Sequence, residues 1–92
     1  MLLTGTGASL GYSVFTPGTV TASVRHEVEE LAYVVSGAGE LRLADEAVAF
    51  AAGDALRIPA GVWHAVANVG DEDCAMVFGF PHPDYPPTER RS

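Results

Sequence analysis

Lysine is absent from this sequence, and five arginines are set against twelve aspartates and glutamates, giving a formal charge of −7. Nucleic acids and anionic membranes attract proteins through clustered positive charge that displaces counterions, so we expect neither as a partner. No apolar run approaches the roughly 20 residues that a membrane-spanning helix needs. No basic leader precedes an apolar stretch at the N-terminus either. We therefore expect a soluble, cytoplasmic protein.

Cysteine and proline are both scarce in the body of the chain. Cys74 is the only cysteine, so no disulfide can form within the chain, and its apolar neighbours predict a buried side chain. Four of the six prolines fall in residues 81–92. Proline lacks the backbone donor that a central strand needs, so this segment is expected to be an extended tail or a strap over the fold.

Sustained helical periodicity is also missing. Short β-prone runs recur instead, about eight of them, separated by turn signals such as Pro17-Gly18. This pattern predicts an all-β fold, either a small barrel or a double-sheet jelly roll. Ninety-two residues suffice for one domain only. We place that domain at residues 1–92, with a core of about 12–80 and the Pro-rich tail at 81–92.

Two stretches, residues 18–37 and 53–68, carry the side chains best suited to chemistry. Period-two alternation turns His26 and Glu30 of the first stretch, and His64 of the second, toward the interior. Two imidazoles and a carboxylate in an apolar interior suit a divalent transition metal (Fe, Mn, Ni, Cu or Zn), with open positions for water or substrate. In a metal-free pocket, Glu30 would instead pair with a protonated histidine, and the three would form an acid/base set.

The spacing within these stretches resembles the two cupin motifs, G-x5-H-x-H-x3-E-x6-G and G-x5-P-x-G-x2-H-x3-N. The second motif is met in full at Gly53, Pro59, Gly61, His64 and Asn68. The first motif is met at Gly18, His26, Glu30 and Gly37. Its first histidine is replaced by Val24. The resemblance covers about residues 18–80, and it implies a small β-barrel with metal ligands inside, usually three histidines and one glutamate.

Carried over by position, the resemblance implies that His26, Glu30 and His64 bind the metal, whereas Val24 has no donor atom. Two histidines and one carboxylate are a sufficient donor set for non-haem iron, although the missing ligand would weaken binding if it normally anchors the ion. His82 would supply a replacement only if the tail folds back; a loop histidine between prolines is more simply an exposed one.

Alternation also predicts the lining of the interior. The expected lining residues are Val20, Ala22, Val24, Ala32, Val34, Leu56 or Arg57, Val66, Met76 and Phe78. The candidate substrate-binding residues among them are Val24, Val34, Arg57, Val66, Met76 and Phe78. Such a cavity is narrow and mostly apolar, and it suits a small organic molecule whose polar group meets the metal. If Arg57 turns inward, it would be the cation available to a carboxylate or an enolate.

Two functions are compatible with this site. The first is a metal-dependent enzyme working by Lewis acidity or through dioxygen, in oxidation, isomerisation or cyclisation. Proteins that look like this include dioxygenases, sugar-phosphate isomerases and polyketide cyclases, so the motif does not select a reaction. The second is a non-catalytic cupin that binds a small ligand or acts as an accessory protein, with Val24 marking loss of the metal.

A homodimer is expected in both cases, because a barrel this small leaves sheet edges that need cover. The candidate interface anchors are Trp63, Phe50 and Tyr33. Trp63 precedes His64 and should therefore point to the opposite face, away from the metal ligands.

Overall fold

The computed structural model describes residues 2–91, and this part of the chain contains ten β-strands and no helix. The strands are β1 (Leu2–Thr4), β2 (Ser9–Phe15), β3 (Ser23–His26), β4 (Glu30–Ser36), β5 (Ala38–Arg42), β6 (Ala47–Ala51), β7 (Ala55–Ile58), β8 (Ala65–Ala67), β9 (Cys74–Phe80) and β10 (Thr88–Arg91). Every pairing between them is antiparallel. Within this part of the chain, therefore, no helix is long and apolar enough to cross a membrane.

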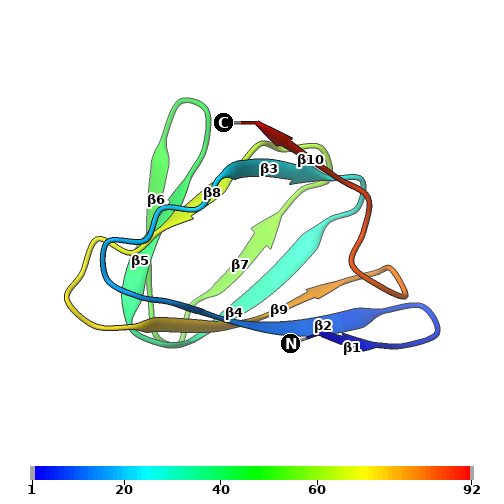
Figure 1. Ribbon diagram of the computed structural model, residues 1–92, viewed down its shortest axis with the longest axis horizontal. Helices are drawn as coiled ribbons and strands as arrows, with labels where there is room; N and C mark the ends of the chain where they lie inside the picture. The colour runs from blue at the N-terminus through cyan, green and yellow to red at the C-terminus, as the bar shows by residue number, and fades with distance from the viewer. Residues whose placement is uncertain (1, 92) are drawn as a thin grey trace.

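The strands form three sheets, in the orders β1-β2-β9-β4-β7, β6-β5-β8 and β10-β3. The five-stranded sheet makes one layer, and Figure 1 shows β3 and β10 on the opposite side of the molecule from β2 and β9. Two isolated bridges, Val20 to Ala67 and Val24 to His64, connect the two smaller sheets into a second layer. The predicted all-β jelly-roll barrel is confirmed.

Strand β4 shows how the sequence pattern separates the interior from the surface. Ala32 and Val34 are buried, while Leu31, Tyr33 and Val35 are each about half exposed, as the period of two predicts. The inward residues join an apolar core whose largest members are Leu41, Phe50, Ile58 and Met76. Burying each such side chain stabilises the fold by about 1.5–3 kcal/mol. Cys74 is fully buried beside them, as predicted.

Two expectations about single residues are wrong. Val20 is 55% exposed and does not face the interior, because the chain makes only an isolated bridge there and strand β3 begins later, at Ser23. Phe50 is 4% exposed and cannot anchor an interface. Its ring packs against the backbone of Gly39, where a side chain would meet the ring at 3.0 Å. Phe50 is therefore part of the core.

The Pro-rich tail ends in an ordered strand. Residues Thr88–Arg91 form β10, which pairs antiparallel with β3 and places Thr88 opposite His26 and Arg90 opposite Val24. All four prolines of the tail precede this strand, so every residue of β10 has the backbone N–H that a strand needs for its hydrogen bonds. The tail is therefore a strap, and it brings the last residues of the described chain to the two histidines of the candidate site.

Candidate functional site

The candidate ligands lie where strands begin or end. His26 is the last residue of β3 and Glu30 is the first residue of β4, with a short loop between them. His64 lies just before β8 and is tied to β3 by two backbone hydrogen bonds, in which the Val24 and His64 amides each donate to the other's carbonyl at 2.9 Å. One turn therefore connects His26 to Glu30, and one β-bridge, between Val24 and His64, brings His64 beside them.

The donor atoms of these residues converge on one point. The Glu30 Oε1 atom lies 3.2 Å from His26 Nε2 and 3.5 Å from His64 Nε2. The two imidazole rings are 5.2 Å apart between centroids, and one ligand atom from each residue falls within 4.8 Å of the others. Both histidines are 5% exposed. The arrangement brings together the two imidazoles and the carboxylate that alternation predicted.

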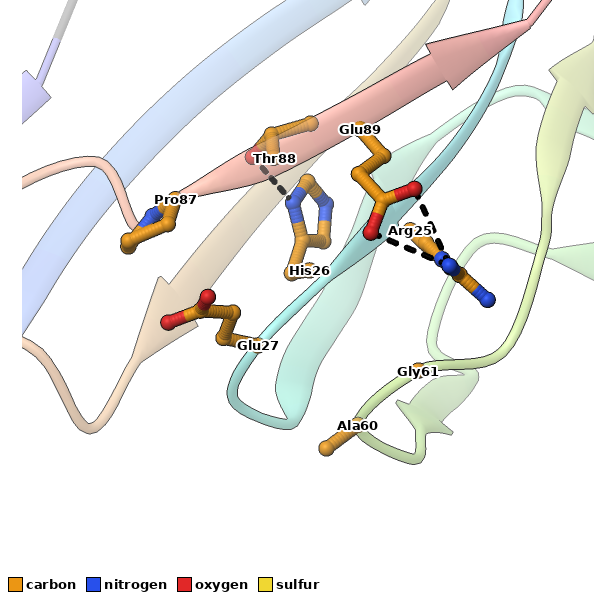
Figure 2. A pocket seen from close by; sticks show the side chains of 8 residues that line it. All are labelled: Arg25, His26, Glu27, Ala60, Gly61, Pro87, Thr88 and Glu89. Atoms are coloured by element: carbon orange, nitrogen blue, oxygen red, sulfur yellow. Dashed lines mark hydrogen bonds and ion pairs between the residues drawn. The ribbon is translucent and has the colours of Figure 1, made fainter.

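Both imidazoles are oriented through their other nitrogen. His64 Nδ1 lies 2.9 Å from the Val62 carbonyl, an atom that can only accept a hydrogen bond. His26 Nδ1 lies 2.7 Å from the Thr88 hydroxyl, as Figure 2 shows. That hydroxyl donates its own hydrogen to the Pro86 carbonyl at 2.8 Å, so it accepts from His26. Each Nδ1 therefore carries a proton. A neutral ring then presents an Nε2 lone pair, which can bind a metal, whereas an imidazolium presents an Nε2–H that donates to Glu30.

The electrostatics fit close coupling of these groups. Burial by itself raises the pKa of Glu30, but hydrogen bonds from His26 and His64 outweigh it and hold this pKa below the usual 4.5. Burial lowers the pKa of His64, but the hydrogen bond to Glu30 and that to the Val62 carbonyl raise it above 6.5 overall. Without a metal, the site therefore favours a carboxylate beside an imidazolium.

The same donor set fits a divalent transition metal. Two Nε2 lone pairs and one carboxylate oxygen are suitable ligands, and both Nδ1 atoms already have the hydrogen-bond acceptors that ligand imidazoles usually have. Val24 lies beside these donors without offering one. Three protein ligands leave coordination positions open, as in metal sites that take water or substrate.

The three candidate ligands line a cavity of about 300 Å³ between the two layers. Four candidate substrate-binding residues line it, namely Val24, Val66, Met76 and Phe78, together with Ala22, Ala32 and Leu56. Val34 does not line the cavity, because it is fully buried in the core. Arg57 lies outside it, exposed, and its guanidinium pairs with Glu29 at 2.9 Å. Alternation turns Leu56 inward, which leaves Arg57 on the outer face.

Sequence reasoning missed part of the cavity wall. Further lining residues are Ser13, Phe15, Thr21, Leu41, Ile58, Phe80, Tyr85 and Arg90. Tyr85 packs edge-on against His26, with ring centroids 5.6 Å apart. Burial raises the pKa of its phenol above 10. Tyr85, Thr88 and Arg90 belong to the tail, whose high proline content predicts an extended segment or a strap. The run Thr88–Arg91 is polar throughout, so no alternation in the sequence signals its inward face.

A larger groove of about 610 Å³ is lined by residues of β3, β10 and the turn at Ala60 and Gly61 (Figure 2). His26 borders both hollows. Its Nε2 atom faces the inner cavity, which also holds Glu30 and His64, whereas its Nδ1 atom is capped by Thr88. The donor set therefore belongs to the smaller, inner cavity.

Two other candidates from the sequence lie apart from the ligands. His82 does not join the cluster, and its Nδ1 atom lies 2.8 Å from the Asp84 carbonyl oxygen. Trp63 points to the outer face, where the guanidinium groups of Arg25 and Arg91 lie over its ring at 4.8 and 4.2 Å from the centroid. The ring helps to hold β10 against β3.

Two curated proteins have sequences similar to this chain. A polyketide synthase, CurC, of Streptomyces cyaneus is 36% identical over 74 residues, covering 79% of this chain and 48% of the relative. A 5-nitrosalicylic acid 1,2-dioxygenase of Bradyrhizobium is 33% identical over 70 residues, covering 76% of this chain and 34% of the relative. The chain thus spans half or less of these curated relatives.

The fold has a close structural counterpart. A conserved protein with a double-stranded β-helix domain from Klebsiella pneumoniae superposes with a TM-score of 0.87 at 22% identity, over 98% of this chain and 79% of that one. The family model described as Cupin domain (Cupin_2) matches residues 11–80, which include both motifs and all three candidate ligands. The chain belongs to the cupin family.

Proposed function

We propose that this protein is a metal-dependent cupin that oxidises a small organic molecule in the inner cavity, with His26, Glu30 and His64 as the metal ligands. One observation carries the proposal: two Nε2 atoms and a carboxylate oxygen converge while each Nδ1 is held by an acceptor. Among Fe, Mn, Ni, Cu and Zn, this donor set favours Fe(II). When bound, the metal would supply Lewis acidity and activation of dioxygen.

The residues of the chain then have distinct roles. The Thr88 hydroxyl and the Val62 carbonyl hold the two imidazoles in the tautomer that offers Nε2. The apolar wall, which includes Met76 and Phe78, excludes water and packs against the carbon skeleton of the substrate. Val24 contributes apolar surface where the cupin motif has a ligand.

The relatives support oxidation as the reaction, since one is a 1,2-dioxygenase of an aromatic acid and shares 33% identity over most of this chain. Isomerisation and cyclisation are the alternatives, because this chain covers only 34% of that relative. Turnover that requires dioxygen would separate oxidation from both.

The metal is tested by elemental analysis of protein purified without added metal. We expect wild type to retain close to one divalent transition metal per site, and His64→Ala and Glu30→Gln to retain far less. His82→Ala is the matched control, since this histidine lies outside the cluster. Negligible metal in wild type and in all variants would refute the proposal.

A second function is favoured by a different observation. Glu30 Oε1 already lies within 3.5 Å of both Nε2 atoms, so the three side chains can satisfy one another without a metal. We infer that the alternative is a non-catalytic cupin that binds a small ligand or serves as an accessory protein. Its thermal stability would rise with ligand and stay indifferent to a chelator. A collapse of stability on chelation would contradict it.

We also propose a homodimer formed through the outer face of the five-stranded sheet. This face carries Leu10, Tyr12 and Val14 of β2 and Leu31, Tyr33 and Val35 of β4, each 43–53% exposed. Val77 lies between Tyr12 and Tyr33 in register, which makes the apolar surface continuous across three strands. Light scattering should give twice the chain mass, and Tyr33→Glu should give the monomer. A monomeric wild type at all concentrations would exclude the dimer.

A further inference from the structure

In the described part of the chain, Arg90 is the one arginine that lines the inner cavity, and it is exposed to solvent. On β10 the side chains alternate: Thr88 contacts His26 inside, and Glu89 pairs with Arg25 outside at 3.0 Å. Arg91 also lies outside, over the ring of Trp63. Arg90 therefore shares the inner face with Thr88, in agreement with its place in the cavity lining.

The other arginines are engaged elsewhere. Arg25, Arg42 and Arg57 form ion pairs with Glu89, Glu40 and Glu29 at 2.9–3.0 Å, and Arg91 is stacked on Trp63. Within residues 2–91, Arg90 is the one arginine for which the structure records neither an ion pair nor an aromatic partner. Arg90 is exposed and also lines the cavity, so its unpaired guanidinium is available to an anion that enters from solvent.

The neighbour of Arg90 across the ladder is Val24. Side chains directly opposite on paired strands project from the same face, so both reach the cavity. The cupin motif has a histidine at this position, and the shorter valine leaves apolar space between the guanidinium and the three candidate ligands. Val24 is paired with Arg90 on one side and bridged to His64 on the other, so an apolar residue lies between the guanidinium and the candidate ligands.

We propose that the inner cavity binds an organic carboxylate, with the carboxylate held by Arg90 and the carbon skeleton against the aromatic wall of Phe15, Phe78 and Phe80. A planar guanidinium matches a carboxylate through two parallel hydrogen bonds. It also holds the anion apart from the negative Glu30. The proposal deepens the proposed function by naming the substrate class, and it rests on that function only for the reaction that follows binding.

The test is calorimetric binding of benzoate, phenylacetate and hexanoate, each compared with its neutral amide. Wild type should bind at least one acid about tenfold or more tighter than its amide, because hydrogen bonds from a guanidinium to a charged carboxylate are stronger than those to a neutral amide. Arg90→Gln should abolish this preference, and Arg90→Lys, which keeps the charge, should restore part of it. Arg57→Gln is the control, since Arg57 lies outside the cavity.

Each outcome decides between possibilities. A wild type that prefers none of the three acids overturns the proposal, and so does an Arg90→Gln variant that keeps the preference while its melting temperature shows that it is folded. Metal content is measured on the same samples. If wild type holds no metal but prefers an acid through Arg90, carboxylate binding stands and the metal-dependent function fails. If wild type holds metal but prefers no acid, the metal-dependent function stands and carboxylate binding fails.

Discussion

Replacing Thr88 by valine should weaken metal binding without touching a candidate ligand. Valine has nearly the shape of threonine but lacks the hydroxyl that accepts the His26 Nδ1 proton at 2.7 Å. Loss of such an outer partner typically costs about 10–100-fold in metal affinity, which corresponds to about 1.4–2.7 kcal/mol. His26 is 5% exposed, so water cannot readily take the place of the hydroxyl.

The folded chain should also lose stability, since an unpaired buried donor costs about 1–3 kcal/mol. The assay is a competition titration of Zn(II) against a chromophoric chelator, combined with ¹⁵N NMR of the His26 ring to identify its tautomer. Thr88→Ser keeps the hydroxyl and should bind metal like wild type. Thr16→Val removes an exposed hydroxyl that contacts Thr19, and it should change neither the Zn(II) affinity nor the tautomer of the His26 ring.

Unchanged Zn(II) affinity in Thr88→Val, together with a His26 ring still protonated at Nδ1, would refute the reasoning. It would show that the orientation of His26 is set by its packing against Phe80 and Tyr85 and not by the hydrogen bond.

Two further predictions concern pH and backbone conformation. In chelator-treated protein, the raised pKa of His64 contributes stability that is complete below pH 6.5 and is lost as pH rises through the raised value. The lowered pKa of Glu30 contributes stability that is complete above pH 4.5 and is lost as pH falls through the lowered value. Melting temperature should therefore peak between about pH 4.5 and 6.5, and a Glu30→Gln variant that keeps this peak would contradict the assignment. Gly37→Ala should cost more than the about 1–2 kcal/mol of a left-handed residue, because φ is +78° and the new Cβ would also clash with the Asp73 carbonyl oxygen. Gly18→Ala, with φ of +85° in open space, should cost only the conformational part in chemical denaturation; equal losses would exclude the clash.

The strands and the three candidate ligands could be predicted because local patterns encode them. Alternation in β4 states which side chains face inward, and it placed Glu30 on the same side as Ala32 and Val34. The motif spacing matches His26 and His64 to positions that lie close together in the barrel shared by the cupin family. What could be read from the sequence was the chemistry of short segments.

The contribution of the tail could not be predicted in this way. Nothing near residue 90 in the sequence indicates that β10 pairs with β3. The Arg25–Glu89 contact between these strands joins residues that are 64 positions apart along the chain. The register of two distant strands is set by the whole packing. Without that register, the sequence offers Arg57 as the candidate inward cation and gives no reason to single out Arg90.

Strand β10 has a single neighbour in the sheets, β3, and a ladder of only four residue pairs. Edge elements this short open locally at a free-energy cost well below that of global unfolding. When β10 detaches, the Thr88 hydroxyl leaves His26 and the Arg90 guanidinium leaves the cavity at the same time. Occupancy of the cavity and closure of this ladder are therefore linked equilibria. The Val24 amide donates to the His64 carbonyl, so slow exchange at the alternate pair, Arg25 and Glu89, would report both.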